Sequence, residues 1–208
     1  MNSPVANYLK KAQAWAARAR ASKFFVIGIV SAVLVALLDQ ATKFWILNDL
    51  KLPELPNGHL EMTEVYDLTF VRNYGASFGL LSGSPLAAVI LSLVALAVTA
   101  ALIHWLPSAT RKLSVAGVAL IMGGAVGNLI DRLRFGYVVD FLNFSGFPFP
   151  HLTPRDGFPF FTVTNGGFIW VFNIADAAIN IGIALLVIDW LRRRRNEAAG
   201  GKPAAGKP

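Results

Sequence analysis

Four long apolar stretches, separated by polar segments, dominate the pattern along the chain. Each is long enough, at ~1.5 Å per helical residue, to cross the ~30 Å hydrocarbon core of a bilayer. The pattern therefore predicts a membrane protein whose all-α core consists of four transmembrane helices. The expected spans cover residues 24–47, 85–106, 113–133 and 168–190.

The segment between the first two spans, residues 48–83, has a different pattern. Short apolar runs such as Leu60–Val65 and Leu68–Val71 lie among prolines, glycines and the turn signal Asn57-Gly58. Short runs bounded by turn residues are typical of strands. We therefore expect a small extramembrane β-structure in this outer region.

The segment between the third and fourth spans, residues 134–167, lacks helical periodicity. Val138 and Val139 form a short extended run that leads into Asp140. Residues 142–167 are rich in phenylalanine and proline, and loops of this length are usually functional or disordered. The aromatic content argues against disorder, so we expect a long outer loop that is buried or touches the lipid interface.

The two ends of the chain flank the membrane domain, which we assign to residues 24–191. Residues 1–23 mix five basic residues with Ala, Leu, Tyr and Trp. This segment fits a basic amphipathic helix on the inner leaflet or an unstructured cytoplasmic tail, and the sequence does not choose between them. Residues 192–208 begin with four arginines and continue in Glu, Ala, Gly, Lys and Pro, which predicts a basic, flexible cytoplasmic tail.

Composition supports a membrane protein and explains the excess of basic residues. Apolar residues make up 55% of the 208 residues and charged residues only 15%, against roughly 25% charged in soluble domains. Of the 19 Lys and Arg residues, five lie in residues 10–23, two at 111–112 and six from 192 onward. Such flanks follow the positive-inside rule, which places both termini in the cytoplasm. This distribution argues against nucleic-acid binding, although the net charge is +7.

The chain contains no cysteine, and its three histidines are scattered. Disulfides and thiolate metal sites are therefore excluded, and the histidines match no metal-ligand spacing. We predict neither a metal nor another cofactor.

Asp176 lies in the first half of the last predicted span. An ion at membrane depth costs at least ~3 kcal/mol, so its side chain must face protein or water. On a helix, Asn173, Asp176 and Asn180 would be spaced i, i+3 and i+7 and would share one face.

Two further spans carry charged side chains. Asp39 and Lys43 are spaced i, i+4 in the order that favours an ion pair, so they fit either a scaffolding pair or part of a site. Asn128, Asp131 and Arg132 share one face of the third span, where Asp131 and Arg132 could likewise form a plain ion pair. Upstream, glycines at 123 and 127 would let a neighbouring helix approach closely.

The predicted topology gathers these polar residues near the outer surface of the membrane. Independent packing roles would not be expected to select one leaflet, so the gathering favours a functional site. The residues concerned are Asp39, Asn73, Asn128, Asp131, Asp140 and Asp176.

Aspartates without metal ligands or a Ser/Cys–His pair suggest a carboxyl dyad. Two carboxylates brought close cannot both ionise cheaply, so one holds a proton while the other can deprotonate a water that attacks a carbonyl. The pattern alone does not say which two of Asp39, Asp131, Asp140 and Asp176 form the pair. A proton-coupled transporter is an alternative, but the inner halves of the spans are nearly free of polar residues. A purely structural membrane subunit is the third alternative, and it would not explain why the polar residues gather near the outer surface.

Five blocks that contain these polar residues follow one another within residues 24–191. They are Asp39-Gln40-Ala41-Thr42-Lys43, Asn73-Tyr74-Gly75-Ala76-Ser77-Phe78-Gly79, Gly124–Arg132, Val138-Val139-Asp140-Phe141 and Phe172-Asn173-Ile174-Ala175-Asp176. In these blocks and their order the sequence resembles the bacterial lipoprotein signal peptidases (signal peptidase II), which are aspartic peptidases.

The resemblance implies roles for individual residues. The catalytic aspartates would be Asp140 and Asp176. The positions that shape the site or hold the substrate would be Asp39, Asn73, Asn128, Arg132 and Asn173. The motif positions with a mainly structural role would be Lys43, Gly75 and Asp131.

The resemblance also implies a reaction and a location. The enzyme would remove the signal peptide of prolipoproteins immediately before the diacylglyceryl-modified cysteine. It would be a multi-pass protein of the bacterial cytoplasmic (inner) membrane, with both termini cytoplasmic and the active site near the outer face. Its partners would be lipid-modified prolipoproteins and membrane lipids, and it would act as a monomer.

Two features depart from the family pattern. Ser77 stands where alanine is more common, and the stretch between Asp140 and Asp176 is longer than the family's short form. We hypothesise that the inserted residues 144–168 rest on the membrane interface and gate the entry of substrate.

Overall fold

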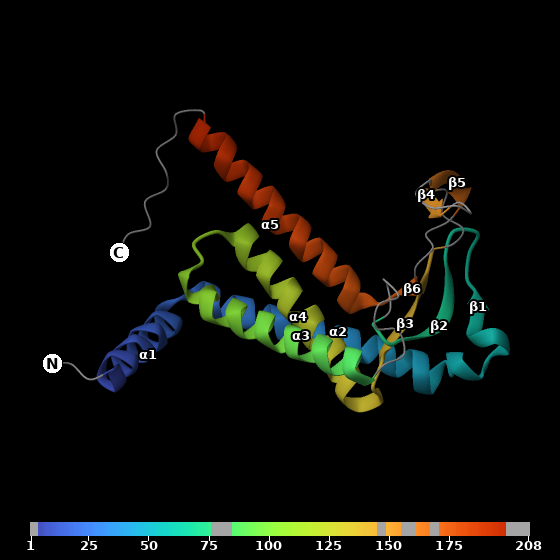
Figure 1. The fold of residues 1–208 in the computed structure, drawn as a ribbon, viewed down its shortest axis with the longest axis horizontal. Coiled ribbons are helices and arrows are strands. Elements are labelled where there is room, and N and C mark those ends of the chain that lie inside the picture. Colours follow the sequence, from blue (N-terminus) through green and yellow to red (C-terminus); the bar gives the residue numbers. More distant parts are fainter. Residues whose placement is uncertain (1–3, 76–84, 145–148, 155–160, 167–170, 199–208) are drawn as a thin grey trace. The chain divides into compact units, whose positions relative to one another are not determined.

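The computed structural model describes residues 4–75, 85–144, 149–154, 161–166 and 171–198. Backbone contacts divide the chain into two compact units. The helical unit comprises Met1–Leu38, Ser92–Leu129 and Ala175–Pro208, and the sheet unit comprises Asp39–Leu91 and Ile130–Ile174. Figure 1 labels the elements of both units.

Four helices are long and apolar enough to cross a membrane, which confirms the predicted fold class. They are α2 (Lys23–Phe44), α3 (Pro85–Trp105), α4 (Lys112–Phe135) and α5 (Ile174–Ala198), preceded by α1 (Pro4–Ala21). Within its most apolar window α4 is 61% buried, against 22% for α2 and α5 and 6% for α3. The helix α4 is therefore the most enclosed of the four, and the others expose wide apolar faces.

The last predicted span begins too early. The helix α5 begins at Ile174, because Val171–Phe172 form strand β6 and pair with Leu142 and Asn143. Asn173 lies outside the helix, contrary to the expected helical face. The helix also continues through the four arginines to Ala198, so the predicted flexible tail was wrong over residues 192–198. Arginine is a good helix former, and cations are favoured in a last helical turn.

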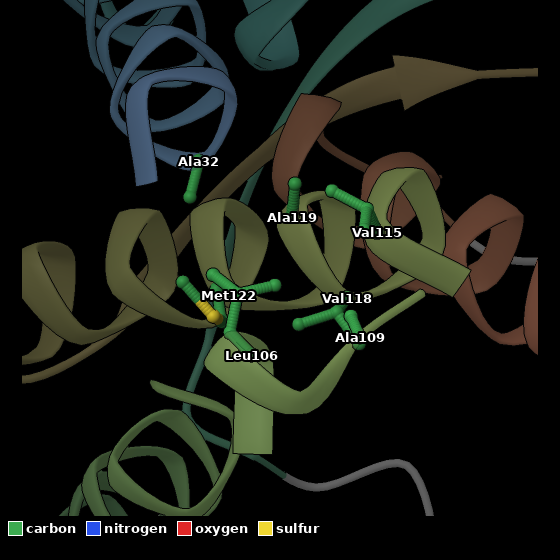
Figure 2. Packing of buried hydrophobic residues seen from close by; sticks show 7 residues of the cluster. All are labelled: Ala32, Leu106, Ala109, Val115, Val118, Ala119 and Met122. Atoms are coloured by element: carbon green, nitrogen blue, oxygen red, sulfur yellow. The ribbon is translucent and has the colours of Figure 1, made fainter. Parts of the chain in front are cut away.

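The apolar core of the helical unit joins α2, α4 and the turn that follows α3. Figure 2 shows Met122 beside Leu106, with Val118 beside Ala109. Small residues bring the backbones together: a Cβ on Gly123 would lie 2.6 Å from the carbonyl oxygen of Ala32 in α2. This contact agrees with the close approach that was expected at Gly123.

Gly117 of α4 and Gly182 of α5 form a second close contact. A Cβ on Gly182 would lie 2.6 Å from the Gly117 carbonyl oxygen, which is backbone and cannot move aside cheaply. We expect Gly182→Leu to destabilise the protein by about 1–3 kcal/mol, measured as a lower thermal unfolding midpoint in detergent. The matched control is Ile181→Phe, because Ile181 is the neighbouring residue of α5 and is 54% exposed. An unchanged midpoint for Gly182→Leu would show that α4 and α5 do not pack at this point.

A buried carboxylate near the end of α5 was not anticipated. Asp189 Oδ2 accepts a hydrogen bond of 2.7 Å from Ser114 Oγ of α4 and lies 3.3 Å from Arg193 Nε. Its Oδ1 lies 3.0 Å from Arg111 Nε, an ion pair without hydrogen-bond geometry. These contacts neutralise a charge that would be costly to bury alone.

The sheet unit contains a four-stranded antiparallel sheet with the order β1-β2-β3-β6. Its first two strands, β1 (His59–Glu61) and β2 (Asp67–Asn73), lie in the segment expected to form β-structure. The third, β3 (Val138–Asn143), pairs with β2 so that Val71 faces Asp140 and Asn73 faces Val138. The small sheet was thus predicted, although half of its strands come from the second connection.

The predicted aromatic loop also contains regular structure. Strands β4 (Phe149–Pro154) and β5 (Phe161–Gly166) pair as a separate antiparallel two-stranded sheet. Hydrogen bonds between the two strands satisfy their backbone groups. Strands do not need helical periodicity, so its absence from this segment did not indicate a loop. The loop expectation was therefore wrong for these residues. The proposed gate at 144–168 lies largely outside the residues whose side chains are described.

Candidate active site

A buried ionic cluster in the sheet unit joins α2 to the end of α4. Lys43 Nζ lies 2.9 Å from Asp39 Oδ2 and 2.7 Å from Asp131 Oδ2, and all three side chains are at most 3% exposed. Gln40 Nε2 donates to Asp131 Oδ1 at 2.9 Å and to Asp39 Oδ2 at 3.2 Å. The i, i+4 pair is present, and the same lysine also neutralises Asp131.

This cluster reaches the strand that carries Asp140. Val139 is the residue directly before Asp140, and its backbone N–H donates to Asp131 Oδ2 at 3.0 Å. The backbone on one side of Asp140 is therefore attached to a carboxylate whose own position is fixed by Lys43.

Asp140 is 1% exposed, and both of its carboxylate oxygens accept amide hydrogen bonds. Asn173 Nδ2 donates to Oδ1 at 2.7 Å and to the Val139 carbonyl oxygen at 3.2 Å. Asn73 Nδ2 donates to Oδ2 at 2.9 Å, across the β2–β3 pairing. The carboxylate is thus oriented from two sides by neutral donors.

Asn73 is itself held by the turn that follows β2. Its Oδ1 accepts the Gly75 N–H at 2.8 Å. Gly75 has φ +89°, and a Cβ there would meet the side chain of Leu91, so only glycine fits without strain. The rest of this sequence block, from residue 76, lies outside the described residues.

Asp176 lies in the helical unit, in the first turn of α5, and is half-buried. Asn128 Nδ2 of α4 donates to Asp176 Oδ1 at 2.8 Å. A carboxylate is favoured at a helix N-terminus, where the backbone N–H groups point toward it. Asn180 instead donates to the Asp176 backbone oxygen, so it does not contact the carboxylate.

The residues singled out in the sequence thus fall into three described groups. Asp39, Lys43 and Asp131 form the ionic cluster, Asn73 and Asn173 hold Asp140, and Asn128 holds Asp176. Arg132 is half-buried near the end of α4. Gln40 was missed as a site residue, although a polar amide in an apolar span was a usable signal.

Within the described ranges, no group of three His, Cys, Asp or Glu side chains could hold a metal ion.

The family profile of signal peptidase (SPase) II matches residues 31–192. The chain belongs to the signal peptidase II family. It is 39% identical to the lipoprotein signal peptidase of Caulobacter vibrioides, over 82% of this chain and 90% of that protein. It is also 39% identical to the lipoprotein signal peptidase of Rhodopseudomonas palustris strain TIE-1, over 79% of this chain and 92% of that protein.

Solved structures of bacterial membrane enzymes share the fold of this chain. A bacterial membrane enzyme determined by the in meso method at 2.3 Å resolution superposes with a TM-score of 0.61 at 26% identity, covering 88% of this chain and 93% of that one. A second, at 1.9 Å resolution, has a TM-score of 0.59 at 27% identity. The expected family is confirmed, and the chain is a peptidase and a multi-pass membrane protein.

Proposed function

We propose that this signal peptidase II removes signal peptides from prolipoproteins by an aspartic mechanism in which Asp140 and Asp176 form the dyad. The substrate class is supported by the lipoprotein signal peptidases to which the chain is similar. The observation that carries the mechanism is the setting of Asp140, a buried carboxylate whose two oxygens are held by Asn73 and Asn173. Asn173 is also only three residues before Asp176 in the chain, which favours a shared site.

The proposed reaction needs only the two carboxyl groups and a water. The ionised aspartate takes a proton from water, whose oxygen attacks the carbon of the scissile carbonyl. The protonated aspartate gives its proton to the carbonyl oxygen, and a tetrahedral intermediate forms. When the C–N bond breaks, the leaving nitrogen takes the proton that the first aspartate removed from water. The other aspartate takes back a proton from a hydroxyl of the intermediate, which becomes a carboxylic acid, and the dyad again holds one proton. Asparagine amides are suited to this task because they orient a carboxyl group without adding charge.

The remaining residues take supporting roles in the proposal. Asn73, Asn128 and Asn173 fix the two carboxyl groups. Asp39 and Asp131 share Lys43, and this ion pairing supports a site-shaping role for Asp39 and a structural role for Lys43 and Asp131. Arg132 is assigned to the same site by the family motif, together with Gly75, whose backbone turn holds Asn73.

The substrate and the membrane setting follow from the family. We infer cleavage immediately before a diacylglyceryl-modified cysteine, near the outer face of the bacterial cytoplasmic membrane. Both termini would then lie in the cytoplasm, because the positive-inside rule places the basic segments that flank the membrane spans on that side. The exposed apolar faces of α2, α3 and α5 support contact with membrane lipids, and we infer that the enzyme acts as a monomer.

The direct test incubates the purified protein in detergent with a prolipoprotein that carries the diacylglyceryl group. We expect release of the signal peptide, with mass spectrometry placing the new N-terminus at the modified cysteine. The matched control is the same precursor without the lipid, which should remain uncut. Equal cleavage of both precursors would refute the lipid requirement, and cleavage of neither would refute the assigned substrate.

The hydrogen bond from Asn128 gives a graded prediction. A hydrogen bond to a charged group contributes about 1.5–3 kcal/mol, so Asn128→Ala should lower kcat/KM by about 10- to 100-fold. Asn48→Ala is the matched control, because Asn48 is exposed and its described hydrogen bond goes to the Phe44 carbonyl oxygen. If Asn128→Ala cleaves as fast as the control, Asn128 does not orient a reacting carboxyl group.

A further inference from the structure

The helix α1 (Pro4–Ala21) has no part in the function proposed above. It precedes residues 31–192, which match the family, and it carries no residue of the site. In Figure 1 it extends away from the beginning of α2, at the end of the helical unit. The helix α1 therefore lies outside the part of the chain that matches the family.

The second half of α1 is fixed to the end of α3. Trp15 Nε1 donates to the His104 carbonyl oxygen at 2.9 Å, and its ring stacks on the His104 ring at 5.9 Å. The same indole meets Phe25 of α2 edge-on at 6.0 Å, and Ala19 is buried. His104 is the second-last residue of a helix that can cross the membrane, so α1 is attached where that span ends.

The side of α1 that carries Trp15 and Ala19 is an apolar stripe, and it continues into the first half of the helix. No described element covers it there. At about 100° per residue, Val5, Tyr8 and Leu9 lie on the side of the helix that carries Trp15 and Ala19. Their exposed fractions are 66%, 72% and 54%. The described contacts of the helical unit therefore leave this part of the stripe uncovered.

The other side of α1 is basic. Lys10, Lys11 and Arg18 are exposed, and the helix contains no acidic residue. The first acidic residue of the whole chain is Asp39. Among the described residues, an apolar stripe that no element covers lies beside basic side chains with no acidic partner, at the end of a membrane span. This combination matches the chemistry of an interfacial helix.

We propose that α1 binds an anionic phospholipid surface. Val5, Tyr8 and Leu9 enter the boundary between headgroups and acyl chains, while the lysines and Arg18 extend to the phosphates, their aliphatic stems lying along the helix. The contact of Trp15 with His104 holds the helix at the depth of this boundary. This inference rests on the membrane spans and not on the peptidase activity.

The absence of cysteine from the chain allows a clean test with single labels. Tyr8→Cys on the apolar stripe and Ala14→Cys on the basic side each receive an environment-sensitive fluorophore in the full-length protein. The two proteins are placed in nanodiscs of phosphatidylcholine alone, or of phosphatidylcholine and phosphatidylglycerol in equal parts. We expect the label at position 8 to shift to the blue only with the anionic lipid, and the label at position 14 to report water in both.

The charge requirement is tested in the Tyr8→Cys background with Lys10→Gln, Lys11→Gln and Arg18→Gln together. Three cations near an anionic surface should shift the ratio of inserted to free label by about a hundredfold, and the triple variant should lose this shift. The matched control removes Arg192, Arg194 and Arg195 by the same substitution and should keep it. Circular dichroism confirms that the helix content is unchanged.

Three outcomes would overturn the proposal. The position-8 label could report water in both membranes, which would exclude insertion. It could report lipid equally in both, which would exclude a role for anionic headgroups. It could also keep its response in the triple variant, which would exclude the three basic residues as the source of the selectivity.

Discussion

Asp140→Asn and Asp176→Asn are each expected to lower kcat for signal-peptide release by about 10⁴-fold or more. Asparagine keeps the shape of the side chain but can neither take a proton from water nor give one to the carbonyl oxygen. The assay is the cleavage of a lipidated prolipoprotein under single-turnover conditions. Activity within tenfold of the unsubstituted protein would remove the substituted residue from the dyad.

The double variant separates a dyad from two independent contributors. Catalytic groups that act as a unit are strongly non-additive, so Asp140→Asn with Asp176→Asn should be no slower than the slower single variant. Losses that multiply would contradict a shared mechanism. Asp49→Asn is the matched control, because Asp49 is exposed at the end of the helical turn that follows α2.

Folding must be checked separately for Asp140→Asn. In the native protein both carboxylate oxygens accept from amides, and an asparagine at 140 presents an amide donor to one of them. A flip of Asn73 would restore that hydrogen bond but lose the one from the Gly75 N–H, and a flip of Asn173 would lose the one to the Val139 carbonyl oxygen. We therefore expect the thermal midpoint to fall by the equivalent of one buried hydrogen bond, about 1–3 kcal/mol, beside the lost activity.

The sequence predicted the helices well because lipid demands a long apolar run whatever the rest of the chain does. It failed where a long-range contact decided the local structure. The segment before Ile174 is as apolar as the helix that follows it, yet Phe172 joins a sheet by pairing with Leu142 of β3. No local period distinguishes a strand that joins an existing sheet from the first turn of an apolar helix.

The site shows the same division between local and long-range information. The pairing of Asp39 with Lys43 follows from helical spacing alone. The second partner of Lys43, Asp131, comes from another helix and could not be deduced from spacing. Likewise, Asn73 could be named from its motif, but its contact with Asp140 depends on the register that sets Val71 opposite Asp140.

Lys43 should be the residue whose loss most damages stability. It is 2% exposed and neutralises both Asp39 and Asp131, so Lys43→Met leaves two buried carboxylates without their cation. Breaking a buried pair in this way costs about 3–5 kcal/mol. We expect a lower thermal midpoint in detergent, with Lys112→Met, an exposed lysine of α4, as the control.

The cost belongs to the charge left behind and not to the lysine itself. Adding Asp39→Asn to Lys43→Met should therefore recover part of the lost stability, although each substitution alone is destabilising. Because Asp131 also accepts the Val139 N–H beside Asp140, the Lys43→Met variant should lose kcat as well. Additive losses in the midpoint would mean that the two carboxylates and Lys43 do not share a buried charge balance. An unchanged kcat in Lys43→Met would mean that the ionic cluster does not position Asp140.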